Sequence, residues 1–163
     1  MSDYYTEQLI KKQTTMKDIC VKILLILAAV VSVLIVFLFP LGIILPVAVI
    51  VAAVIFFRRL DVEYEYLYVN GDLDIDKIMH KAKRKRLFSM SVNDLELLAP
   101  VDAVELRQYQ RAKTYDYTSC SGQGKVYALV VAERGQTKKI LFEPNETIIE
   151  GFYLLTPRKV VRR

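Results

Sequence analysis

The sequence predicts two parts of different class: a membrane α-hairpin, followed by an α+β or mainly-β domain. In that domain an antiparallel sheet, bent or partly closed into a barrel, ends in a C-terminal helix. Three observations support this. A 35-residue run without charge, residues 23–57, contains Pro40 and Gly42 in its middle. Residues 62–68 alternate in polarity, as in a half-buried strand. An amphipathic helical pattern follows Asn145.

The uncharged run is too long for one span. A bilayer core about 30 Å thick needs roughly 20 helical residues, whereas 35 residues in one helix would reach roughly 52 Å. Pro40 lacks an amide donor and Gly42 tolerates positive φ. We therefore expect helices at about 19–39 and 41–57. Pro46 then lies near the first turn of the second helix, where proline is tolerated.

Three other interpretations of the apolar run remain. A cleaved signal peptide is disfavoured, because no small-residue cleavage site follows the first arm and a second apolar arm does. A shallow hairpin that enters and leaves one leaflet is an alternative, since the second arm is near the lower length limit for a span. The third is a single span with an external C-terminal domain.

Lysines and arginines beside the arms predict the orientation. Six of them flank the arms, and the turn between the arms has none: Lys11, Lys12, Lys17, Lys22, Arg58 and Arg59. Cytoplasmic flanks carry the excess of Lys and Arg, so we expect a multi-pass protein of the cell (plasma) membrane with both termini in the cytoplasm. The positions of Cys20 and Cys120 disfavour a disulfide, which agrees with a reducing compartment.

The arms lack groups that could move a substrate. Within residues 23–57, Ser32 is the one hydroxyl, and there is no acidic or basic side chain, Asn or Gln, so a channel, pump or transporter is disfavoured. The hairpin is expected to be an anchor. Homo-oligomerisation through small residues stays open. These residues are Ala28, Ala29, Ser32, Ala48, Ala52 and Ala53.

The chain divides into four predicted parts. They are a cytoplasmic N-terminal tail (1–18), the transmembrane hairpin (19–57), a cytoplasmic β domain (60–156) and a basic tail (157–163).

Within the β domain, Asn70 and Gly71 supply a two-residue hairpin turn between a tyrosine-rich strand and an aspartate-rich strand. We then expect a short strand at 87–91, a helical turn at 93–98 and a long loop at 107–124. A second hairpin turns at Gly135. A helix capped by Asn145 closes the domain.

This order of elements resembles the bacterial pleckstrin-homology-like (PH-like) domain. The resemblance lies in three stretches, YEYLYVNGDLDID (64–76), KRKRLFSMSVNDLELLAP (83–100) and GKVYALVVAERGQTKKILFEPNETIIEGFYLL (124–155). The whole chain is also similar to small two-span membrane proteins of Gram-positive bacteria. The resemblance implies a binding or assembly module, a scaffold rather than an enzyme, and it transfers no functional residues.

The residues themselves predict no catalytic, cofactor or metal site. His80 is the single histidine, and no serine or cysteine stands in a nucleophile context. Cys120, with Lys125 nearby in the sequence, is expected to be a plain exposed loop cysteine. The DLDID stretch (72–76) lacks the glycine and glutamate of a calcium loop, and GQGKV lacks the first glycine and the final Ser or Thr of a phosphate loop.

The stretch KAKRKRLF (81–88) concentrates five cations: Lys81, Lys83, Arg84, Lys85 and Arg86. Residues 61–76 before it hold carboxylates and no Lys or Arg, so ion pairing across neighbouring strands is the first interpretation. Contact with anionic lipid, helped by Arg58, Arg59 and the basic tail, is the second. Nucleic-acid binding is disfavoured because the run is short and no aromatic residues are interleaved with it.

We therefore expect a non-enzymatic integral membrane protein that presents a PH-like domain for protein binding or assembly at the membrane. The alternative is anionic-lipid or membrane-surface sensing through residues 81–86, and a cryptic enzyme is less favoured. The expected partners are the lipid bilayer and another protein, with no nucleic acid. The sequence does not specify which protein, which process or which oligomeric state.

Overall fold

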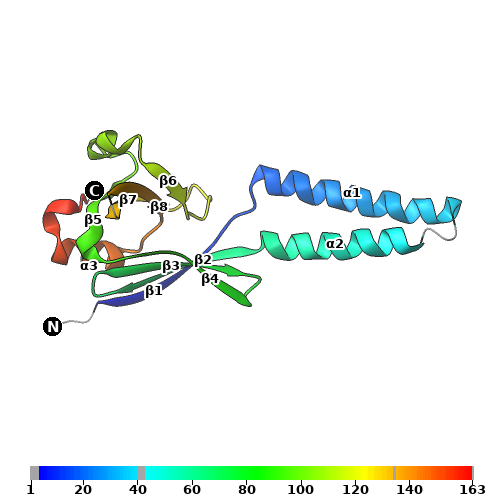
Figure 1. The fold of residues 1–163 in the computed structure, drawn as a ribbon, viewed down its shortest axis with the longest axis horizontal. Helices are drawn as coiled ribbons and strands as arrows, with labels where there is room; N and C mark the ends of the chain where they lie inside the picture. The colour runs from blue at the N-terminus through cyan, green and yellow to red at the C-terminus, as the bar shows by residue number, and fades with distance from the viewer. Residues whose placement is uncertain (1–3, 40–42, 134, 163) are drawn as a thin grey trace.

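The computed structural model describes residues 4–39, 43–133 and 135–162, without the side chains of residues 37, 38 and 59. Two long helices extend from a head that holds two β-sheets and a short helix (Figure 1). The helices are α1 (Met16–Leu38), α2 (Ile44–Leu60) and α3 (Glu146–Leu155). The strands are β1 (Tyr5–Lys11), β2 (Val62–Val69), β3 (Asp72–Met79), β4 (Lys83–Met90), β5 (Leu95–Pro100), β6 (Lys113–Asp116), β7 (Tyr127–Glu133) and β8 (Gln136–Phe142).

Both long helices differ from their predicted limits by a few residues. α1 begins earlier than residue 19 because Thr15 and Asp18 form a capping box. The Thr15 hydroxyl accepts a hydrogen bond from the Asp18 amide, and the Asp18 carboxylate accepts one from the Thr15 amide. α2 starts and ends three residues later than the predicted 41–57. The predicted turn at residues 40–42 lies outside the described residues.

α1 and α2 pack side by side through small side chains. Ser32, Pro46 and Ala53 are buried, and the Ser32 hydroxyl donates a hydrogen bond to the Ala29 carbonyl at 2.7 Å. Two of the residues predicted as candidates for oligomerisation, Ser32 and Ala53, are therefore buried without a second copy.

Most other side chains of the helix pair are apolar and exposed. α1 contains a 21-residue stretch, Met16–Val36, with a mean hydropathy of 3.1, long and apolar enough to cross a membrane. The apolar stretch of α2, Ile44–Arg58, is shorter. Leu24 and Ile44 are 68% and 76% exposed. Contact of so much apolar surface with water costs free energy, so the pair favours an apolar environment.

The first sheet has the strand order β1-β2-β3-β4, and all its pairings are antiparallel. Asn70 and Gly71 form the predicted turn between β2 and β3, with φ of 49° and 102°. β4 begins at Lys83 rather than at residue 87, because the basic run pairs with β3.

Strand β1 shows that part of the predicted N-terminal tail (1–18) belongs to the sheet, where it pairs with β2 along its whole length. The Gln8 side chain holds β1 against the segment before α3 through two hydrogen bonds. Its amide nitrogen donates to the Glu143 carbonyl at 2.9 Å, and its amide oxygen accepts from the Asn145 amide at 2.7 Å. These partners lie more than 130 residues away in the chain.

The second sheet has the order β5-β7-β8-β6, in which β6 runs parallel to β8 and the other pairings are antiparallel. The β7–β8 hairpin is as predicted, with Gly135 at φ 77°. The helical turn predicted at 93–98 is wrong, because a 3₁₀ turn at Val92–Asp94 leads directly into β5. The loop predicted at 107–124 contains β6.

Helix α3 confirms the predicted closing helix. The Asn145 side chain caps it by accepting a hydrogen bond from the Ile148 amide at 3.0 Å. Gly151 lets the helix approach the first sheet closely, because a Cβ at this position would lie 2.4 Å from the Tyr68 ring. α3 therefore covers the end of the space between the two sheets.

The predicted basic tail (157–163) is attached to the head. Pro157–Lys159 forms a 3₁₀ turn, Val160 forms a parallel bridge with Leu98, and the Val161 amide donates to the Leu98 carbonyl at 2.8 Å. The domain therefore extends beyond its predicted end at residue 156.

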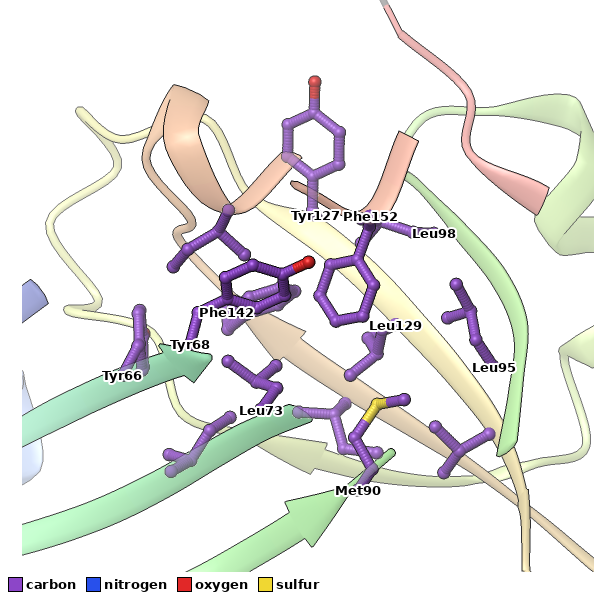
Figure 2. Packing of buried hydrophobic residues seen from close by; sticks show 14 of the residues in the cluster. Tyr66, Tyr68, Leu73, Met90, Leu95, Leu98, Tyr127, Leu129, Phe142 and Phe152 are labelled. Carbon is purple, nitrogen blue, oxygen red and sulfur yellow. The ribbon is translucent and has the colours of Figure 1, made fainter. Parts of the chain in front are cut away.

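The main core lies between the two sheets and beneath α3 (Figure 2). Phe152 from α3 packs against Tyr68 with ring centres 4.9 Å apart, and Tyr66 packs against Phe142 at 5.5 Å. The Tyr66 hydroxyl donates to the Tyr117 carbonyl at 2.6 Å. The mainly antiparallel strand pairing and the closing C-terminal helix agree with the predicted fold class of the head, although β6 pairs parallel with β8.

Candidate functional site

The basic run lies at the end of the head from which the helices extend (Figure 1). The β3–β4 connection contains His80 and Lys81, both in the left-handed region with φ of 51° and 54°. The His80 amide donates to the carbonyl of Asp61, the single residue between α2 and β2, at 3.0 Å. The chain thus places this turn directly beside the end of α2.

The two arginines of the run form ion pairs within the first sheet. Arg84 contacts the carboxylates of Glu65 and Asp76, the latter at 3.6 Å from its Nε. Arg86 lies 2.8 Å from Asp74 and 3.3 Å from Asp76. This arrangement confirms the expected pairing of acidic and basic strands. Asp76 is only 6% exposed, so its two arginine partners offset the cost of burying its charge.

The pKa of the Glu65 carboxyl is shifted within this network. Burial raises the pKa of its carboxyl above the ordinary value, and a hydrogen bond with Glu7 raises it further. Arg84 opposes both effects by favouring the ionised form. Because Glu7 and Glu65 lie on adjacent strands, their carboxylates repel each other when both are ionised.

Three lysines of the run are in a different position from the arginines. Lys81, Lys83 and Lys85 are exposed, and no ion pair joins them to another described side chain. Arg58, at the end of α2, is also exposed, whereas the side chain of Arg59 lies outside the described part. Of the seven predicted surface cations, Arg84 and Arg86 are thus committed to the sheet, and Lys81, Lys83, Lys85 and Arg58 are available to an external anion.

The residues considered for catalysis are not brought together. His80 is exposed and lies 4.0 Å from Asp61, and Cys120 occupies an exposed loop at φ 59°. Among the described residues, no group of His, Cys, Asp or Glu side chains has metal-binding geometry. Gly124, of the stretch that superficially suggests a phosphate loop, packs against the Glu143 carboxylate.

Two open hollows on the described surface have volumes of about 230 and 380 Å³. The first lies beside the start of α3 and is lined by Tyr127, Ile149 and Arg162, among others. The second lies on the outer face of the second sheet, beside Arg107 and Lys139. Neither hollow contains His80 or a cysteine.

The sequence analysis missed β1, which supplies Glu7 and Lys11 to the outer face of the first sheet. The signal for it is the alternation in YTEQLIK, which is weak because its inward-facing side chains include Thr6 and Gln8.

Comparison with known proteins gives one match. A family described as bacterial PH-like domain (DUF6106) matches residues 2–162. No curated protein and no solved structure shows a significant match.

Proposed function

The chain belongs to the bacterial PH-like domain family, and we propose that it is a non-enzymatic integral membrane protein whose head binds or assembles other proteins at the cytoplasmic face of the plasma membrane. In this proposal α1 and α2 cross the bilayer as a hairpin. Both termini then lie in the cytoplasm.

The observation that carries this proposal is the exposed apolar surface of the helix pair. The 21-residue apolar stretch of α1 matches the roughly 20 residues that a span needs. The shorter stretch of α2 can still cross a bilayer if Arg58 reaches up to the headgroups. A helix pair of this composition is stabilised by lipid.

The connections to the head support a fixed position close to the bilayer. One residue, Asp61, separates α2 from β2, and residues 12–15 separate β1 from α1. Two backbone hydrogen bonds hold the second connection, from the Lys12 amide to the Val62 carbonyl and from the Gln13 amide to the Ser119 carbonyl. Both connections leave the head at the same end, so a head held by both has little freedom to move away from the membrane.

The three available lysines support a second role, contact with anionic lipid. A Lys or Arg near an anionic surface gains about 1 kcal/mol. Lys81, Lys83 and Lys85 lie beside the end of α2, where the headgroups would be. Arg84 and Arg86 contribute less to this contact because each would have to leave carboxylate partners.

Alkaline extraction of membranes tests the anchored role. We expect the full chain to remain in the membrane pellet under conditions that release peripheral proteins. Release of the chain into the supernatant would contradict a membrane hairpin.

A dye at position 82 tests the lipid role in the full chain. Its quenching by headgroup-labelled lipid should be stronger in anionic than in neutral bilayers, and Lys81, Lys83 and Lys85 changed together to Gln should abolish the difference. The matched control changes Arg107, Arg111 and Lys125 to Gln. It removes the same charge from exposed positions outside the β3–β4 turn. Equal loss in both variants would contradict a specific role of the turn.

A further inference from the structure

The edges of the two sheets are protected to different degrees. An open strand edge is a template for another strand, and proteins block such edges with charges, short strands or covering segments. β4 carries four consecutive cations, β6 has four residues, and β5 is covered by its bridge to Val160. β1, a seven-residue edge strand, carries only two charged residues, Glu7 and Lys11, which are not adjacent, and no described strand pairs with its outer edge.

The backbone of β1 presents unused hydrogen-bonding groups. The Asn70 amide donates to the Tyr4 carbonyl, and the Lys12 amide donates to the Val62 carbonyl. Because hydrogen bonding alternates along an antiparallel pair, the even residues of β1 face β2. The N–H and C=O groups of the odd residues therefore point away from the sheet. These residues are Tyr5, Glu7, Leu9 and Lys11.

The same odd residues place their side chains on the outer face of the sheet. Tyr5 and Leu9 are 59% and 57% exposed, which is high for large apolar side chains in a strand. Glu7 lies between them, and Glu65 on the adjacent strand adds negative charge. The edge thus offers an alternating aromatic, acidic, aliphatic and basic pattern.

The edge is held in place before any partner arrives. The even residues form the hydrogen bonds that hold β1 in place. The Gln8 side chain donates to the Glu143 carbonyl and accepts from the Asn145 amide, and the Thr6 hydroxyl accepts from the Asn145 side chain at 3.1 Å. A preformed strand loses little conformational entropy when it pairs.

A second copy in the same membrane does not fit this edge. β1 runs obliquely, mainly along the long axis of the molecule, which is also the direction of α1 and α2 (Figure 1). Antiparallel pairing of two β1 strands would therefore turn one copy upside down in the bilayer. In a parallel pair, the bonding residues of one strand lie one residue higher or lower than those of the other strand. Two copies related by a twofold axis along the membrane normal hold the same residues at the same height, so they cannot pair in this way.

We propose that the free edge of β1 binds an extended segment of another cytoplasmic protein, which adds to the first sheet as an antiparallel strand. Its side chain opposite Glu7 is a cation, the one opposite Leu9 is apolar and the one opposite Lys11 is an acid, because these pairs complement the edge. This inference rests on the proposed function, which places the head in the cytoplasm, and it names the surface through which the head binds protein.

A peptide of the sequence YTEQLIKKQ, residues 5–13, is a defined probe. Paired antiparallel with Leu9 opposite Leu9, it sets its own Lys11 opposite Glu7 and its own Glu7 opposite Lys11. Free in solution, it is not subject to the orientation that the membrane imposes on a second copy. The labelled peptide, at trace concentration, is titrated with full chain in single-copy nanodiscs and followed by fluorescence anisotropy.

The expected signature alternates along β1. On binding, the amides of Glu7, Leu9 and Lys11 should gain protection from hydrogen exchange, whereas those of Gln8 and Ile10, already bonded to β2, should change little. Leu9→Pro removes an outward donor without breaking a bond to β2, so binding should weaken about tenfold or more. Leu9→Thr, the matched control, keeps the donor and should weaken binding about threefold.

Exchanging the charges of one pair between the chain and the peptide gives a test that a folding defect cannot mimic, because only a folded chain can regain binding. Glu7→Lys should weaken binding about threefold, and a peptide with glutamate in place of its own Lys11 should restore it. Uniform protection along β1, unchanged binding of the Leu9→Pro chain, or no rescue would overturn the proposed edge. Disulfide-linked dimers of a Leu9→Cys chain that also carries Cys20→Ser and Cys120→Ser, in proteoliposomes, would overturn the choice of partner, because they would show that a second copy occupies the edge.

Failure of this inference is distinguishable from failure of the proposed function. A chain that binds the probe but is released by alkali contradicts the membrane anchor alone. A chain that stays in the membrane and ignores the probe contradicts the edge alone.

Discussion

The helix pair and the head contain the same kinds of apolar side chain with opposite exposure. Leu24 in α1 and Ile44 in α2 are 68% and 76% exposed, whereas Leu98 and Ile140 in the head are completely buried. The head covers its apolar side chains with its own two sheets and α3. The pair buries little beyond small residues such as Ser32 and Ala53. The comparison shows that the head covers its apolar side chains itself, whereas the helix pair leaves most of its own uncovered.

The largest effect expected from this comparison is on the unfolding of the head. Phe152→Ala removes a fully buried ring that packs on Tyr68, so it should lower the free energy of unfolding by about 3–5 kcal/mol. Leu24→Ala, at an exposed position of α1, should leave it unchanged. Near-ultraviolet circular dichroism of the tyrosines during denaturation measures both. An equal decrease in the free energy of unfolding for both variants would contradict the difference between the two regions.

The second effect falls on the helix pair and leaves the head unchanged. Leu27→Arg places a charge at the middle of α1, where membrane insertion should become about 2.5–3.5 kcal/mol less favourable. The unfolding of the head should not change, because Leu27 is exposed and outside it. The fraction of chain that resists alkaline extraction is the measurement, with Leu27→Ile as control. Full retention of the arginine variant would argue that α1 is not in a bilayer.

A smaller effect separates two tyrosines within the core. Tyr66→Phe removes a hydroxyl that donates to the Tyr117 carbonyl, so it should destabilise the head by about 1–2 kcal/mol. The Tyr68 hydroxyl is buried and makes no hydrogen bond of good geometry among the described residues. Burial raises its pKa to about 12, and the nearby Gly71 backbone lowers it only in part. Tyr68→Phe should therefore be neutral or slightly stabilising. Denaturant titration compares the two, and the opposite ranking would contradict these assignments.

The smallest effect is a pH dependence that arises at Glu65. Its pKa is raised in the folded head, so the folded state binds this proton more tightly than the unfolded state does. The resulting stabilisation is fully present below the ordinary value of about 4.3 and is lost as pH rises through the raised pKa. Glu65→Gln should remove this slope from the plot of stability against pH. Parallel curves for the two chains would exclude Glu65 as its source.

Local patterns predicted the parts of the fold that depend on local physics. Asn70 and Gly71 supply the positive φ values of their turn, and Asn145 caps α3 through a residue three positions away. The pairing of acidic and basic strands also followed from the sequence, because consecutive antiparallel strands lie next to each other.

Long-range contacts explain what local patterns did not predict. β1 is held by partners near Glu143, and the segment after α3 is held by Leu98 in β5. The division of the basic run had the same cause. Arg84 and Arg86 form ion pairs with carboxylates of the first sheet, whereas Lys83 and Lys85 form no ion pair with a described side chain. The register shift between Ile75 and Asp76 decides which residues of β4 share a face with these carboxylates.

Labelling of one native cysteine tests the central claim most directly, that the apolar pair holds the head at the cytoplasmic face. In a Cys20→Ser chain, Cys120 is the remaining thiol, and it is exposed on the head. A membrane-impermeant maleimide should label it in inverted membrane vesicles and leave it unlabelled in intact cells. Labelling in intact cells would place the head outside and contradict the account.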